Sequence, residues 1–138
     1  MKKAAIILTA LVCVVPLIIA LIPTASLSKE EIVAAVREYE TVLREDIQYN
    51  NFERTEGFIR LYKIDVTDEV VDFMCSDGTD GRYVGFFYTA ADDMSALWCA
   101  GPADQMTPDG VGYSYTEGDY SYYTEPITEN FYYYEAQF

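Results

Sequence analysis

The sequence begins with an uncharged apolar run from Ala4 to Ile22, and Lys2 and Lys3 stand directly before it. A run of this length is long enough to cross a bilayer as a helix. Because basic residues remain on the cytoplasmic side, we expect the chain after about Pro23 to lie outside the cytoplasm. The run therefore predicts a membrane segment in residues 1–26, inserted through residues 4–22, and one extracytoplasmic domain in residues 27–138.

The apolar run has two interpretations, a retained signal anchor and a cleaved signal peptide. A cleaved signal has a shorter apolar region and ends at small residues that a peptidase can read. Here the one stretch of small residues after the run is Thr24 to Ser26, and Pro23 directly before it disfavours cleavage there. We therefore favour a single-pass membrane protein with its domain outside, and keep a secreted protein as the alternative.

Acidic residues are concentrated in the second half of the chain. Residues 28–63 contain six basic and eight acidic side chains, whereas residues 64–138 contain Arg82 as the one basic residue and fifteen acidic ones. Such a surface repels nucleic acid and anionic lipid, because both are polyanions. It would attract a basic protein or peptide, although acidity can equally serve to keep a tyrosine-rich surface soluble.

The domain is predicted to begin with an amphipathic helix. Ser28 followed by Glu31 forms a capping-box pattern, and Asn50 and Asn51 provide a stop. Apolar residues recur at helical spacing; they are Ile32, Val36, Tyr39, Leu43 and Ile47.

The hydrophobic period then changes from helical spacing to alternation, which is typical of strands. The predicted strands are 58–66, 70–75, 83–89, 96–99, 111–116, 120–124 and 131–138, with turns or loops at 67–69, 76–81 and 101–110. Short strands joined by tight turns favour an antiparallel sheet. We therefore predict an α+β fold, in which the amphipathic helix packs on an antiparallel sheet of about four to six short strands.

Cys75 and Cys99 are the two cysteines beyond the membrane run. A lone pair of cysteines in an oxidising compartment usually forms a disulfide. We therefore predict a Cys75–Cys99 bridge, with two unrelated buried thiols as the alternative. A zinc site is excluded by the lack of histidine and of a CxxC motif.

The sequence offers no set of catalytic residues. Without histidine, the serine–histidine and cysteine–histidine nucleophile systems cannot form. Phosphate-binding and dinucleotide-binding glycine motifs are also missing from the sequence. Asp77 and Asp80 are weak calcium candidates, because carboxylates in loops suit hard cations. The loop does not follow the EF-hand pattern, so we predict a non-enzymatic protein with no cofactor.

Tyrosine is unusually frequent near the C-terminal end of the chain. Tyr113, Tyr115, Tyr120 and Tyr122 alternate with small or polar residues, as one face of a hairpin would, and Tyr132 follows in the last strand. Tyrosine offers a large contact area at low entropic cost, although it is also simply a good strand residue. We therefore predict a cell-envelope interaction module whose contact residues are these five tyrosines. Binding of a small ligand or divalent cation, such as a sugar or calcium, is the alternative.

Overall fold

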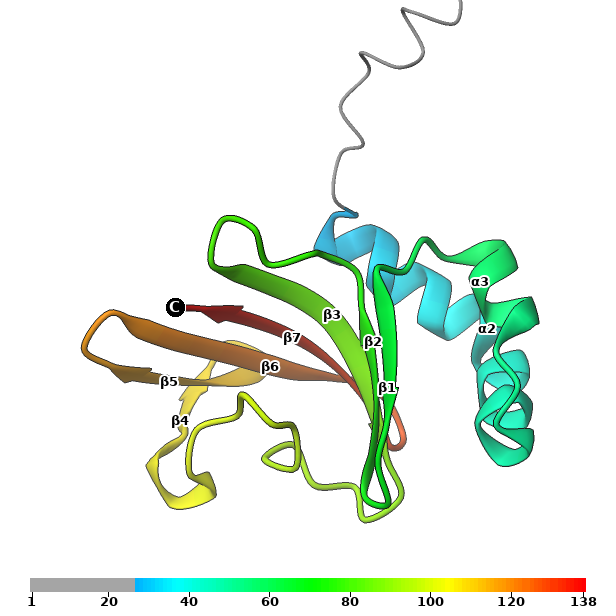
Figure 1. Cartoon of the computed structure of the whole chain (residues 1–138). Coiled ribbons are helices and arrows are strands. Elements are labelled where there is room, and N and C mark those ends of the chain that lie inside the picture. The colour runs from blue at the N-terminus through cyan, green and yellow to red at the C-terminus, as the bar shows by residue number, and fades with distance from the viewer. Residues whose placement is uncertain (1–26) are drawn as a thin grey trace, which may run out of the picture.

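The computed structural model describes residues 27–138 and shows an α+β fold, in which one long helix packs on a seven-stranded antiparallel sheet (Figure 1). The strands lie in the order β1-β2-β3-β7-β6-β5-β4. Within residues 27–138, no helix combines the length and the apolar character needed to cross a membrane. The predicted membrane segment, residues 4–22, lies outside the described residues.

Helix α2 (Lys29–Tyr49) begins at the predicted capping box. The Ser28 hydroxyl accepts a hydrogen bond from the Glu31 N–H (3.2 Å), and the Glu31 carboxylate accepts one from the Ser28 N–H (2.8 Å). The helix ends at Asn50, which adopts the left-handed conformation that commonly closes helices (φ 49°). Both predicted ends of the helix are therefore confirmed.

The predicted apolar face of α2 points into the core. Ile32, Val36 and Leu43 are fully buried. Tyr39 interrupts the regular helix geometry (φ −107°, ψ 18°) and stacks on Phe58 with ring centroids 4.0 Å apart. At the kink, α2 therefore packs against the ring of Phe58, which follows it in the chain.

The predicted strand 58–66 forms only in its second half, and an unpredicted short helix precedes it, with residues 59–62 irregular between the two. Helix α3 spans Glu53–Phe58, and strand β1 covers only Lys63–Val66. The buried Asp46 carboxylate of α2 accepts hydrogen bonds from the backbone N–H (3.1 Å) and hydroxyl (2.9 Å) of Thr55. This tertiary contact holds the segment as a helical turn, and local strand propensity could not reveal it.

The remaining strands are β2 (Val70–Met74), β3 (Arg82–Thr89), β4 (Thr107–Asp109), β5 (Gly112–Glu117), β6 (Tyr120–Thr128) and β7 (Phe131–Gln137). Three elements differ from the prediction, and one of them is β6, which extends four residues beyond the predicted strand 120–124. The short β4 lies at the edge of the sheet inside the expected loop 101–110, so the sheet has seven strands rather than four to six. The predicted strand 96–99 is not formed, and its residues make turns.

The two faces of the sheet are covered by different parts of the chain (Figure 1). The helix face, which carries Phe73, Phe86 and Tyr133, packs against α2. The loop face, which carries Phe87 and Tyr134, packs against the connection between β3 and β4, residues 90–106. Apolar side chains from that connection fill the second cluster; they include Met94, Leu97, Cys99 and Met106. The sheet is therefore buried on both sides over much of its area.

Candidate functional site

The five tyrosines singled out in the sequence share the loop face, as the alternation predicts. Tyr115 pairs with Tyr122 across β5 and β6, and Tyr113 pairs with Thr124 in the same alternating set. Tyr122 and Tyr132 are only 1% and 7% exposed. These two side chains are core residues in the structure and cannot contact a partner there.

Hydrogen bonds from tyrosine hydroxyl groups hold the connection 90–106 against the loop face. Tyr132 donates a hydrogen bond to the Asp92 carboxylate (2.7 Å), and Tyr120 donates one to the Cys99 carbonyl. Gly101 lies directly on the Tyr115 ring, so that a Cβ atom there would come within 2.3 Å of the ring. Part of the tyrosine set therefore positions this connection.

An aromatic patch remains at the surface where this connection meets the end of β7. We use this name for Tyr83, Trp98, Tyr115, Tyr120 and Phe138. Trp98 and Phe138 are 55% and 57% exposed and stack in parallel, with ring centroids 6.0 Å apart. The ring centroids of Tyr120 and Phe138 are 4.8 Å apart, and the Tyr83 ring contacts the Trp98 ring edge-on with centroids 5.6 Å apart. Large aromatic groups held at the surface in this way are typical of interaction sites.

A buried carboxylate holds Trp98 in place. Asp72 in β2 is 2% exposed and accepts hydrogen bonds from the Trp98 indole N–H (3.0 Å) and the Tyr134 hydroxyl (2.9 Å). Burial raises the pKa of Asp72 to about 6, despite these two hydrogen bonds. Because the indole N–H points inward to Asp72, the rest of the ring is presented outward.

A turn and a carboxylate border the aromatic patch. The loop 76–81 packs against it, because Gly78 lies so close to the Tyr83 ring that a Cβ atom would come within 2.4 Å. That loop carries the exposed Asp77 and Asp80. On the other side, the Tyr115 hydroxyl donates a hydrogen bond to Glu117 (2.8 Å). Glu117 is therefore the carboxylate in direct contact with the patch, whereas Asp77 and Asp80 line a pocket on the helix side of the sheet.

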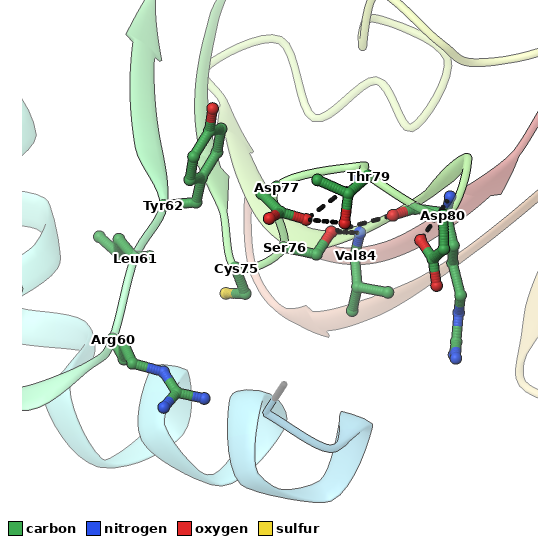
Figure 2. Close-up of a pocket in the computed structure, with 10 residues that line it drawn as sticks. Arg60, Leu61, Tyr62, Cys75, Ser76, Asp77, Thr79, Asp80 and Val84 are labelled. Atoms are coloured by element: carbon green, nitrogen blue, oxygen red, sulfur yellow. Dashed lines mark hydrogen bonds between the residues drawn. The ribbon is translucent and has the colours of Figure 1, made fainter. Parts of the chain in front are cut away.

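Asp77 and Asp80 are mainly engaged by their own loop (Figure 2). Asp77 accepts hydrogen bonds from the Thr79 N–H and hydroxyl, which lowers the pKa of its carboxyl. Asp80 accepts one from the Arg82 N–H. Between residues 27 and 138, no group of three or more potential metal-ligating side chains lies together. The two residues thus shape a turn and do not converge with further ligands.

The same loop forms one wall of an open pocket of about 390 Å³ on the helix side of the sheet. Figure 2 shows Arg60, Leu61 and Tyr62 on the opposite wall, with Cys75 between the two walls. Burial raises the pKa of the Cys75 thiol to about 12. A thiol of that acidity stays protonated and is a poor nucleophile, so the pocket does not assemble a reactive cysteine.

The predicted Cys75–Cys99 disulfide is not formed in the structure. Both cysteines are free and buried. Cys75 belongs to the cluster on the helix face, whereas Cys99 belongs to the cluster on the loop face. The sheet therefore separates the two thiols, and the alternative of two unrelated buried cysteines describes them.

Sequence reasoning identified Tyr115 and Tyr120 of the aromatic patch and missed Tyr83, Trp98 and Phe138. Trp98 falls in the predicted strand 96–99, which the structure does not form, and the other two residues are distant from it in sequence. The signal that could have indicated Trp98 is its place in a segment rich in small and turn-forming residues, where a large aromatic side chain is more often exposed. Comparisons with known protein families, with curated proteins and with solved structures found no match to this chain.

Proposed function

We propose that this protein is a non-catalytic binding module of the cell envelope, held at the membrane by residues 4–22, and that its aromatic patch binds a cationic segment of another protein. The observation that supports it is the exposed, stacked pair of Trp98 and Phe138. An envelope location rests on the apolar run and the basic residues before it.

Charge favours a cationic partner for the patch. The Glu117 carboxylate contacts the patch through Tyr115, and the chain after Lys63 carries fifteen acidic residues against one basic residue, Arg82. Arginine and lysine side chains are attracted to the faces of aromatic rings, most strongly to tryptophan. A guanidinium group can therefore stack on Trp98 while a neighbouring carboxylate neutralises it.

Calorimetric titration of the chain with hexa-arginine tests this proposal, with hexa-citrulline as the matched uncharged peptide. We expect hexa-arginine to bind, hexa-citrulline to bind much more weakly, and the affinity to fall as salt rises. Trp98→Ala is expected to weaken binding about tenfold or more, as loss of a central aromatic contact does. Tyr49→Ala is the matched control, because Tyr49 is an exposed aromatic residue at the end of α2. Equal losses in both variants would refute the proposal.

Binding of a divalent cation is the second candidate and has less support. Its candidate ligands, Asp77 and Asp80, already accept hydrogen bonds within the loop. A cation bound to the folded state would raise the melting temperature by mass action. A clear rise in millimolar calcium, lost in Asp77→Asn, would favour this function over peptide binding.

A further inference from the structure

The helix face of the sheet is not fully covered by α2. Helix α2 begins over the row formed by Glu125 and Tyr133, where the Lys29 ammonium group contacts Glu125 at 2.6 Å. Beyond that row, an open depression of about 450 Å³ lies over β5, β6, β7 and the start of β3. Its volume is within the range of roughly 300–1,000 Å³ that small-molecule sites occupy. We call it the polar groove.

Two rows of polar side chains form the floor of the polar groove. In the first row, Ser114, Tyr123 and Glu135 are register partners on β5, β6 and β7. The second row continues across to β3, and its members are Thr116, Ser121, Gln137 and Arg82. Side chains in register point to the same face of a sheet, so hydroxyl, carboxylate, amide and guanidinium groups converge on one depression.

The charges of the polar groove nearly balance, unlike those of the surrounding acidic half. Arg82 and Glu135 form an ion pair with an N–O distance of 3.1 Å. Asp109 adds one further carboxylate at the margin. Arg82 would repel a strongly cationic ligand. The carboxylates of Glu135 and Asp109 would repel an anionic one. The lining therefore best matches a neutral ligand that has many hydrogen-bonding groups.

From this lining we propose that the polar groove binds a neutral oligosaccharide. Sugar hydroxyls both donate and accept, so they can engage planar carboxylate, amide and guanidinium groups together with the serine and threonine hydroxyls. The ring of Tyr123 lines the polar groove, and the Lys29 ammonium group lies 5.2 Å from its centroid; the part of the ring that faces the groove offers an apolar surface to a pyranose ring. This site is on the face of the sheet opposite the aromatic patch and does not depend on the function proposed for that patch.

Calorimetry with the full chain and three neutral trisaccharides tests the proposal. The probes are maltotriose, cellotriose and tri-N-acetylchitotriose, in a zwitterionic detergent because sugar-headed detergents would compete. At least one probe should bind with a dissociation constant of about 1 mM or lower. Glu135→Gln should weaken that binding about tenfold, as loss of a charge-assisted hydrogen bond does.

A second variant separates loss of the site from loss of the fold. Ser121→Tyr fills the polar groove from a half-buried strand position and should abolish trisaccharide binding while leaving hexa-arginine binding unchanged. Trp98→Ala should leave trisaccharide binding unchanged. Failure of all three probes to bind the unmodified chain would overturn the proposal, and so would normal binding to Ser121→Tyr. Neither result would bear on peptide binding at the aromatic patch.

Discussion

Asp72→Asn should change the pH dependence of stability more than any other single substitution of an acidic residue. Asp72 is buried between Trp98 and Tyr134, and burial raises its pKa from 3.8 to about 6. Folding therefore makes the carboxyl hold its proton more tightly. The contribution of the Asp72 carboxyl to the free energy of unfolding is fully present below pH 3.8, and it is lost as the pH rises through 6.

The magnitude follows from the rise in pKa. At about 1.4 kcal/mol per pKa unit, the rise to about 6 corresponds to about 3 kcal/mol lost between acid and neutral pH. Asparagine carries no charge at either pH and keeps one carbonyl acceptor, so it removes this dependence. It should also lose about 1 kcal/mol at every pH, because one hydrogen bond is less well made.

Urea denaturation followed by the fluorescence of Trp98, the single tryptophan of the chain, measures the effect. The unfolding free energy of the variant minus that of the unmodified chain should rise by about 2.4 kcal/mol between pH 4 and pH 7.5, because at pH 4 the unfolded chain has already lost part of its proton from this carboxyl. Asp68→Asn in the exposed β1–β2 turn is the matched control and should show no such rise. A difference that stays constant within about 1 kcal/mol would show that Asp72 ionises as an exposed carboxyl does, which would refute the reasoning.

Three further predictions concern the fold. Ser28→Ala removes the capping box of α2 and should lower the unfolding free energy by about 1 kcal/mol in urea denaturation; no change would mean that the helix start is not closed by this contact. Asp46→Ala leaves the buried N–H and hydroxyl of Thr55 without their acceptor and should cost about 2 kcal/mol, measured in the same way; the half-exposed Arg54 keeps Glu45 as a partner. In a Cys13→Ser chain, Cys75 and Cys99 should react with a thiol reagent only after denaturation, and reducing agent should leave the melting temperature unchanged; a fall in melting temperature would instead indicate a disulfide.

The parts of the fold that depend on local pattern were predictable from the sequence. The helix at Lys29–Tyr49 has its cap, its apolar period and its stop within one continuous stretch. Strands β2, β3 and β7 likewise follow the predicted runs closely. In each case the signal lies within the residues of the element itself.

The predictions that were wrong concern features that depend on contacts between residues distant in the sequence. Helix α3 is stabilised by the Asp46 carboxylate, which belongs to α2. Residues 96–99 are apolar and were predicted as a strand, yet they form turns within the connection that covers the tyrosines of the loop face. The separation of Cys75 from Cys99 also follows only from the position of the sheet between them.

The candidate site shows the same division. Alternation along the chain placed Tyr115 and Tyr120 on one face, which the pairing of β5 with β6 confirms. Which tyrosines remain accessible depends on the course of residues 90–106. That course buries Tyr122 and Tyr132 and brings Trp98 beside Phe138. No pattern within a single strand contains this information.

Binding at the aromatic patch is tested most directly by following the indole N–H signal of Trp98 in nuclear magnetic resonance spectra during titration with hexa-arginine. The chain contains one tryptophan, so its indole signal is unambiguous. We predict that this signal shifts progressively until binding is saturated, together with the backbone signals of Tyr83, Tyr120 and Phe138. An unchanged indole signal at peptide concentrations that saturate binding in calorimetry would contradict the account, because the peptide would then bind elsewhere on the protein.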